Sequence, residues 1–150
     1  MTRLTREEQR YLTVRKLRGA ALQEVAQAGF AAATIDRISE KAGFSRGAFY
    51  SNFNSKEELV LELLEQDNSA EMNAWVDMIA AAANMDELYA RMAERFAAYI
   101  ARTDWSLFLL ELQLHAKRSA DFNAHYRQHM KKTDVQVRNL IAALFTRAER

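Results

Sequence analysis

The sequence predicts an all-α protein. Apolar residues recur at helical spacing along almost the whole chain, while the alternating pattern of strands is missing. Proline is absent and only 4 of the 150 residues are glycine, so little interrupts helices. We expect two units: short helices over residues 1–60, and a larger helical body over residues 61–150 joined to them by a long helix.

The first helix is predicted from its ends and from one apolar face. Thr5 and Glu8 have the spacing of a capping box, which satisfies the free amides of a helix start. Gly29 followed by Phe30 predicts a stop, with the glycine left-handed and the next apolar residue packing back. Between them lies an apolar stripe at spacings of three and four: Val14, Leu17, Ala21, Val25 and Ala28.

Two short helices and a long one should follow. Thr34 is the expected N-cap of a helix that ends at Gly43, with Asp36 in its first turn. Ser45 should cap the next, and Ser55 with Glu58 should open the long helix. The expected buried residues of this region are Ile35, Ile38, Ala42, Phe49 and Phe53.

Two short helices joined by a glycine-containing turn and braced by a longer one form a helix-turn-helix arrangement. The second short helix carries Arg46, Gly47, Tyr50 and Ser51 on its outward face. Arginine can donate two hydrogen bonds to guanine, and glycine permits close approach, so this face suits a DNA major groove. The alternative is a small amphipathic helix with incidental surface residues.

Residues 17–64 resemble the DNA-binding domain of the TetR family of bacterial repressors. The resemblance covers Gly29-Phe30, Thr34-Ile-x-x-Ile-x-x-x-Ala-Gly, Ser45-Arg-Gly-Ala-Phe-Tyr-x-x-Phe and Ser55-Lys-Glu-Glu-Leu. It implies that Arg46, Gly47 and Tyr50 face bases, and that phosphates are held by Thr34, Ser45, Asn52 and Lys56. Two positions depart from the family: Asn52 replaces the more frequent histidine, and Ser51, also assigned to the DNA contact, is unusually small.

The rest of the chain is predicted to form the helical body. Asn84 and Glu87 indicate a helix start, followed by the stripe Leu88, Met92, Phe96 and Tyr99. The segment after Asp104 is apolar almost all round, so we expect helices to surround it. A near-heptad seam, expected to contact a helix of this chain or of a second subunit, comprises Phe122, Tyr126, Met130, Thr133, Val137, Leu140 and Leu144.

The resemblance implies a dimer, a double-stranded DNA operator and a small-molecule effector. Family members usually have two C-terminal helices, whereas only one, beginning near Asp121, is evident, so we expect a truncated chain or a different interface. Methionine and aromatic walls suit an adaptable apolar site, although an ordinary helical core has the same residues. The expected ligand-binding residues are Trp75, Met78, Met92, Phe96, Tyr99, Trp105, Phe108, Leu112 and His115.

Other chemistry has weaker support. Glu111 and His115 lie one turn apart and could act as acid and base, which leaves a small helical enzyme as a remote alternative. His125 and His129 have a spacing that can bind zinc, but further ligands are not evident, so neither a metal nor a cofactor is expected. A helix-turn-helix protein without an effector is the nearer alternative.

Charge and composition limit the partners and the compartment. Residues 1–60 carry ten basic and seven acidic residues, residues 61–112 three and ten, and residues 113–150 eight and three. The basic first part suits nucleic acid. Cysteine is absent, which suits a reducing cytoplasm. We expect a cytoplasmic protein without membrane contact, because no apolar run is long enough to cross a bilayer and the N-terminus lacks a signal-peptide core.

Overall fold

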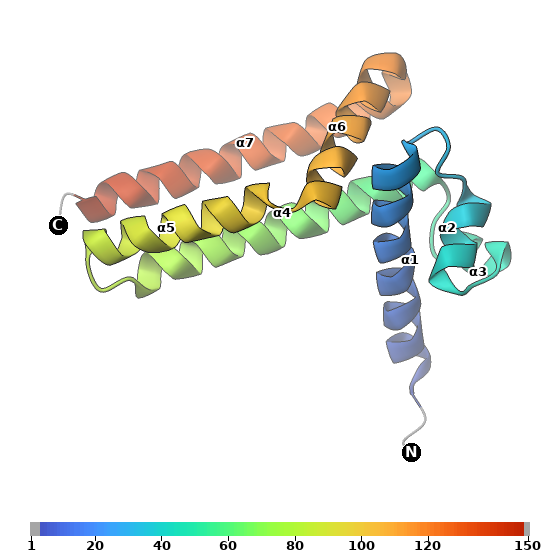
Figure 1. Cartoon of the computed structure of the whole chain (residues 1–150), viewed down its shortest axis with the longest axis horizontal. Coiled ribbons are helices and arrows are strands. Elements are labelled where there is room, and N and C mark those ends of the chain that lie inside the picture. The colour runs from blue at the N-terminus through green and yellow to red at the C-terminus, as the bar shows by residue number, and fades with distance from the viewer. Residues whose placement is uncertain (1–3, 149–150) are drawn as a thin grey trace.

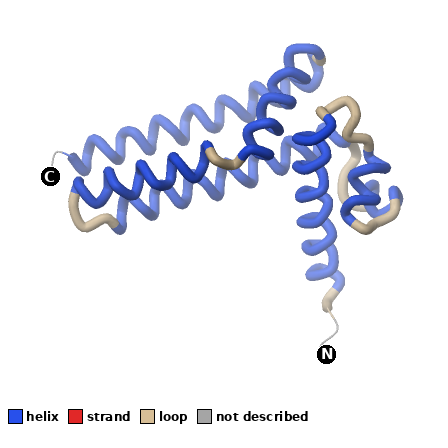
Figure 2. The backbone as a smooth tube through the Cα atoms, viewed as in Figure 1, coloured by secondary structure: helices blue, strands red, loops and turns tan. Residues whose placement is uncertain are grey.

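The computed structural model describes residues 4–148, and within that range its regular structure is entirely helical (Figure 2). Three helices form the N-terminal end: α1 (Arg6–Ala28), α2 (Ile35–Ala42) and α3 (Arg46–Tyr50). Four more follow: α4 (Lys56–Ala81), α5 (Met85–Ile100), α6 (Thr103–Arg118) and α7 (Ala120–Ala148). The all-α prediction is therefore confirmed.

The molecule is elongated because α4 runs from the small N-terminal helices to the far end of the body (Figure 1). There, α5 and α7 lie alongside it, and the shorter α6 crosses from α5 toward α1. No helix of the described range is long and apolar enough to cross a membrane.

The predicted helix starts form as expected, with one difference. Thr5 and Glu8 make the full reciprocal capping box, and the hydroxyls of Thr34, Ser45 and Ser55 each accept a backbone N–H in the following turn. At α4, however, the Glu58 carboxylate accepts from the N–H of Asn54 instead of that of Ser55. The Ser55 box is therefore only half formed as predicted.

Both predicted glycine stops are present, but they differ in conformation. Gly43 is left-handed, with φ 79° and ψ 29°. Gly29 has φ 84° but ψ 159°, so the prediction of a left-handed helical glycine is wrong there. The extended ψ lets the chain leave α1 directly, while Phe30 still packs into the core as expected. A positive φ is costly for residues with a Cβ, which explains glycine at both positions.

One hydrophobic core spans the residue-60 boundary. Leu17, Ala21 and Val25 of α1 meet the predicted Ile38, Phe49 and Phe53, and also the buried face of α6 and Phe122 of α7. A second, smaller cluster lies at the far end, where Leu88 and Ile79 pack with Leu140 and Leu144. The large core therefore ties α6 firmly to the N-terminal helices.

One prediction about the body is wrong, and a second had left two alternatives open. The α6 helix is not surrounded: it packs on α1 and α7 from one side, so Leu107, Leu110 and Leu114 remain exposed. The α7 seam contacts α4 and α5 of the same chain, but Met130 is exposed and Thr133 accepts a hydrogen bond from Asn68. The seam therefore contacts helices of its own chain, which is one of the two alternatives expected for it.

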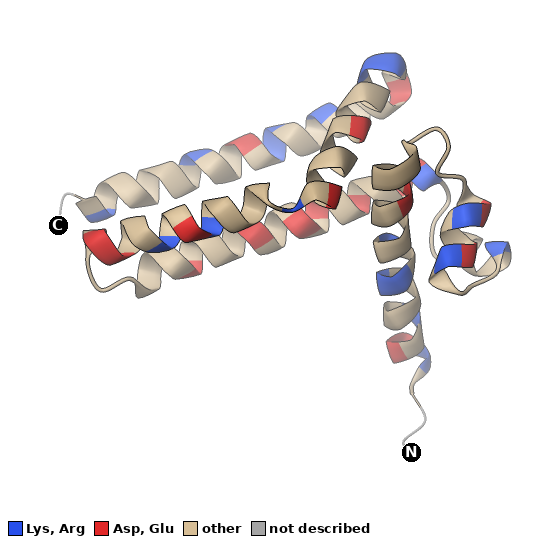
Figure 3. Ribbon diagram, in the orientation of Figure 1, with Lys and Arg blue, Asp and Glu red and all other residues tan. Residues whose placement is uncertain are grey.

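Acidic side chains of α4 hold the surrounding elements. The carboxylates of Asp67 and Glu71 pair with Arg102 and Arg95, each through both oxygens. Glu62 pairs with Arg18 of α1, and Glu65 with Lys132 of α7. Red acidic positions accordingly recur along α4 in Figure 3. The excess negative charge of residues 61–112 thus has a structural use, because α4 is the helix on which the others assemble.

Candidate DNA-binding interface

The predicted recognition face is presented by α3, a helix of five residues. Phe49 is fully buried and Phe53 nearly so, which anchors the inner side. Arg46, Gly47, Tyr50 and Ser51 are exposed on the outer side. The phase of the helix deduced from the sequence is therefore confirmed, because the apolar and polar residues fall on the two expected sides.

Arg46 is the most polar group of this face, and it is already oriented. Its Nη1 donates to both carboxylate oxygens of Asp36, each at 2.9 Å, and its Nη2 donates to the Tyr50 hydroxyl at 3.4 Å. These partners, Asp36 first, raise the pKa of the Arg46 guanidinium above its ordinary value. The guanidinium remains charged and largely exposed, with N–H groups left for an outside acceptor.

The fold itself does not require glycine at position 47. A Cβ built there would meet only the Ser45 hydroxyl oxygen, at 3.7 Å, which is an ordinary contact. Alanine would also favour the helix. The bare backbone at this exposed position therefore fits close approach by something outside the chain.

The residues assigned to phosphate contacts differ in how exposed and how engaged their side chains are. Thr34 and Ser45 are exposed caps at the starts of α2 and α3, while Asn52 donates one amide N–H to the carbonyl of Ala48 at 2.8 Å. Lys56 is half-buried, donates to the Phe30 carbonyl and lies 4.1 Å from the centre of the Phe30 ring. Burial lowers the pKa of Lys56. This lysine braces the turn after α1, and its contact with phosphate stays a prediction.

A polar cleft continues the face onto α1. It has a volume of about 650 Å³, and its walls are Arg6, Glu7, Arg10, Ser51 and Asn52. Neither arginine forms an ion pair within residues 4–148. Sequence reasoning missed this site because the start of α1 and the residues that follow α3 come together only in the folded chain.

Buried charge fixes the angle between α1 and α2. Glu24 is only 6% exposed, and its two oxygens accept from Lys41 Nζ and Arg37 Nε, both at 2.9 Å. The Lys41 hydrogen bond is the main cause that lowers the pKa of Glu24. Because Arg37 and Lys41 are one turn apart on α2, this three-residue network holds that helix in place beside α3.

Glu111 and His115 turn out to connect α6 to the turn after α1. The Glu111 carboxylate accepts the N–H of Phe30 at 2.9 Å, and the His115 ring stacks on the Phe30 ring with centres 3.9 Å apart. Burial is the main cause that lowers the pKa of His115, and Glu57 opposes it. Both side chains thus serve the junction between the body and the N-terminal helices.

The predicted ligand-binding residues do not gather around one cavity. Trp105, Phe108 and Leu112 pack into the large core, where Trp105 Nε1 donates to the Tyr99 hydroxyl at 3.1 Å. Met78 and Met92 border the small cluster, and Trp75 lies 5.8 Å below the Arg95 guanidinium. Phe96 is 59% exposed, so it does not line an enclosed cavity within this chain, and its contact with a ligand stays a prediction.

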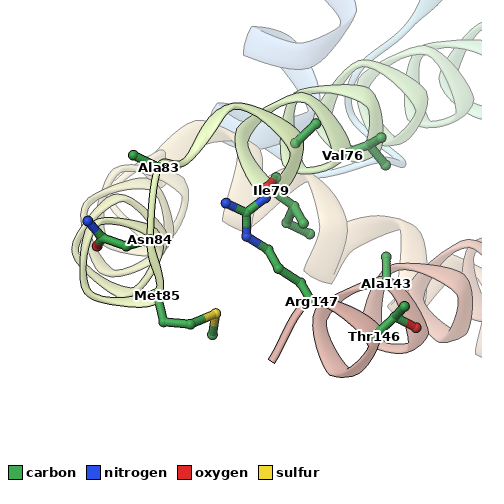
Figure 4. A pocket seen from close by; sticks show the side chains of 9 residues that line it. Val76, Ile79, Ala83, Asn84, Met85, Ala143, Thr146 and Arg147 are labelled. Carbon is green, nitrogen blue, oxygen red and sulfur yellow. Dashed lines mark hydrogen bonds between the residues drawn. The ribbon is translucent and has the colours of Figure 1, made fainter. Parts of the chain in front are cut away.

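A separate cavity lies at the far end of the body, between the end of α4 and the end of α7 (Figure 4). Its volume is about 640 Å³. Arg147 reaches from α7 to the carbonyls of Ile79 and Ala82, which it caps. The walls are Val76, Ile79, Ala80, Ala83, Asn84, Met85, Ala143, Thr146 and Arg147. No motif in the sequence predicts this cavity.

The histidine pair does not form a metal site. His129 is buried and its Nε2 lies 2.8 Å from Asn68 Nδ2, while His125 is exposed beside the Asp121 carbonyl. Within residues 4–148, no three histidine, cysteine or acidic side chains come together as metal ligands would.

Comparison with known proteins adds the family. Residues 17–63 match the family described as bacterial regulatory proteins, tetR family. The repressor AcnR of Corynebacterium efficiens is 31% identical over 117 residues, which cover 78% of this chain and 57% of that protein. The chain thus spans little more than half the length of this relative.

Solved structures show the same fold. The fatty acid degradation regulator FadR of Bacillus halodurans superposes with a TM-score of 0.74 at 19% identity, covering 87% of this chain and 67% of that one. A protein of Saccharomonospora viridis solved in complex with choline gives 0.65 at 18% identity, covering 87% and 68%. Residues 17–63 thus carry the sequence pattern of the tetR family of bacterial regulatory proteins, and the chain shares the fold of these solved structures.

Proposed function

We propose that the chain is a sequence-specific DNA-binding transcriptional regulator, and a repressor. The observation that carries the proposal is the outer face of α3, where an exposed arginine, a bare glycine and an exposed tyrosine stand on a helix anchored by Phe49. This chemistry suits base edges in a major groove. The names of the family and of its relative AcnR, which belong to regulators and not to enzymes, support the same reading.

Within this proposal, the predicted residues divide between two tasks. Arg46, Gly47 and Tyr50 approach bases, while the exposed caps Thr34 and Ser45 contact phosphates with Ser51 and Asn52. Phosphate contacts carry no sequence information but set register and salt dependence. The arginines of the α1 cleft are better placed for a phosphate than Lys56, whose ammonium is engaged with Phe30.

Gel-shift competition between a selected operator and random DNA tests the assignment. Arg46→Ala should weaken operator binding by about 1–3 kcal/mol and random DNA much less, because a bidentate base contact is lost. Arg10→Ala should weaken both alike and reduce the salt dependence by about one phosphate contact. Arg15→Ala, on another side of α1, is the matched control. Unchanged operator preference in Arg46→Ala would exclude base reading by this residue.

We further propose that a small, largely apolar molecule releases the DNA. The cavity at the far end has a volume suited to a small ligand, and its walls are apolar apart from a few groups that include Arg147. The choline complex of one structural neighbour supports a ligand at some site of this fold. Because α4 runs from this cavity to Lys56, movement at the far end of α4 can change the position of the recognition helix α3.

Octanoate is a suitable probe, because it combines an apolar tail with a carboxylate for Arg147. We expect octanoate to lower operator affinity in fluorescence anisotropy, and Arg147→Ala to reduce that effect. Arg138→Ala, an exposed arginine of the same helix, should leave it intact. Operator affinity that no apolar carboxylate changes would favour the alternative, a helix-turn-helix regulator without an effector at this cavity.

We also propose a homodimer, as is common for helix-turn-helix regulators on two half-sites. Leu140 and Leu144 of the α7 seam pack inside the chain, whereas Met130 at the edge of the seam, Ile141 and Phe145 are exposed at spacings of eleven and four residues. These spacings place them on one face of the helix. The flank Met130–Ile141–Phe145 is therefore our candidate for the contact with a second copy, and light scattering of Phe145→Glu tests it.

A further inference from the structure

Asp36 is an acidic residue at a surface that should meet the negative backbone of DNA. It lies in the first turn of α2, and its side chain is 65% exposed. A helix start tolerates an acid there, but it does not need one, because the Thr34 hydroxyl already caps the helix. Its only hydrogen-bonded side-chain partner within residues 4–148 is Arg46, ten residues along the chain on the recognition helix.

The geometry of the pair defines what Asp36 does to Arg46. Both carboxylate oxygens accept from the same nitrogen, Nη1, at 2.9 Å, and Tyr50 accepts from the other terminal nitrogen. The guanidinium carbon also lies 5.5 Å from the centre of the Tyr50 ring. Two groups from two helices therefore hold a side chain that would otherwise sample many rotamers.

An arginine held in this way retains free N–H groups. The guanidinium has five N–H donors, and the bonds to Asp36 and Tyr50 occupy at most three of them, which leaves Nε–H and one Nη2–H. A carboxylate that fixes the plane of the guanidinium lowers the entropy lost when it pairs with a guanine edge, which requires two parallel hydrogen bonds. The same negative charge repels phosphates, so it weakens any binding mode in which Arg46 contacts the backbone instead.

We propose that Asp36 is a specificity-determining residue, which orients Arg46 toward base edges and opposes binding through the DNA backbone. The proposal rests on the proposed DNA-binding function and goes beyond it, because it assigns sequence selectivity to an acidic residue outside the recognition helix. If Asp36 has this role, its removal should strengthen binding to random DNA and at the same time lower the selectivity for the operator.

The test compares Asp36→Asn with Glu40→Gln. Glu40 is an exposed acid one turn further along the same face of α2, and it has no side-chain partner in the described range. Both variants remove one negative charge and keep the shape of the side chain. Dissociation constants for an operator duplex and a scrambled duplex, measured by fluorescence anisotropy at one salt concentration, give the selectivity of each protein.

Both variants should bind scrambled DNA more tightly, since each loses one repulsive charge. Only Asp36→Asn should lose selectivity, by about three- to tenfold. The pair of Asp36 and Arg46 becomes stronger when operator DNA excludes water from it, so its loss costs more there than the loss of an exposed ion pair. In an Arg46→Ala background the same change should leave selectivity as it is. Thermal unfolding should be equal in both variants, which separates orientation of Arg46 from damage to α2.

Each outcome decides a separate question. If wild-type protein does not prefer any duplex over scrambled DNA, the proposed function fails and this inference falls with it. If wild-type protein is selective but Asp36→Asn behaves as Glu40→Gln does, the DNA-binding function stands and Asp36 has no part in selectivity. A selectivity loss that persists in the Arg46→Ala background would also overturn the inference, since Asp36 would then act without Arg46.

Discussion

The junction between α6 and the turn after α1 gives a sharp prediction about stability. Glu111→Ala removes the carboxylate that accepts the N–H of Phe30 at 2.9 Å. The bond is partly buried, and Phe30 itself is 4% exposed, so water replaces the lost acceptor poorly. An unsatisfied N–H in such a place costs about 1–3 kcal/mol. We expect the free energy of unfolding to fall by that amount.

Guanidinium unfolding followed by far-UV circular dichroism measures the change in the free energy of unfolding. In a separate thermal experiment, the melting temperature should fall by about 2–4 °C for each kcal/mol lost. Glu111→Gln retains an oxygen that can accept the same N–H, so it should recover most of the stability. Gln113→Ala, exposed on the same helix, is the control for helix propensity. If Glu111→Ala unfolds at the wild-type midpoint, the hydrogen bond does not hold the junction and the reasoning is refuted.

Three further predictions address the interface, the assembly and the pH response. Gly47→Ala should leave the fold intact or slightly more stable, since a Cβ there has room, but it should weaken binding to operator DNA in gel shifts. Unchanged affinity would mean that DNA does not approach this backbone. Leu140→Glu should destabilise the chain through its internal seam, whereas Phe145→Glu should yield a folded monomer in light scattering; a dimer in the second variant would place the contact elsewhere. Burial lowers the pKa of His129, so the unfolded chain takes up the proton first, and stability should fall as pH drops through the ordinary value of 6.5 toward the lower folded pKa. His129→Gln should flatten that slope in thermal unfolding, and an identical slope would assign it to other groups, His115 included.

Local signals in the sequence predicted the N-terminal helices well. Helix starts are indicated by the side chains of Thr5, Thr34 and Ser45, and a helix end is indicated by Gly43. Both effects act within one helical turn, so the local sequence is enough to predict them. The outward face of α3 was predictable for the same reason. Once Phe49 is assigned to the core, helical geometry alone places Arg46 outside.

Contacts between distant segments were not predictable in this way. The pairing of Asp36 with Arg46, and the binding of the Phe30 N–H by Glu111, depend on how separate helices cross. Phe96 shows the converse case, because it lies on a predicted apolar stripe and yet its side chain is exposed. Periodicity defines a face of a helix, but it does not determine whether another helix covers that face.

Lys56 illustrates a third limit. Its position in the motif suggests a phosphate contact, whereas the folded chain directs its ammonium to the Phe30 carbonyl and ring. A basic residue can pair with DNA or brace a turn, and the sequence pattern is the same for both. Only the neighbouring groups in three dimensions distinguish these uses.

The central claim is that the outer face of α3 reads DNA sequence, and selection from a random duplex library by the purified chain tests it most directly. The account predicts that wild-type protein enriches a defined site, and that Arg46→Ala enriches a site in which at least one guanine position is relaxed. An Asp36→Asn selection in parallel should give a weaker consensus. Failure of the wild-type chain to enrich any sequence, or an identical consensus from Arg46→Ala, would contradict the claim.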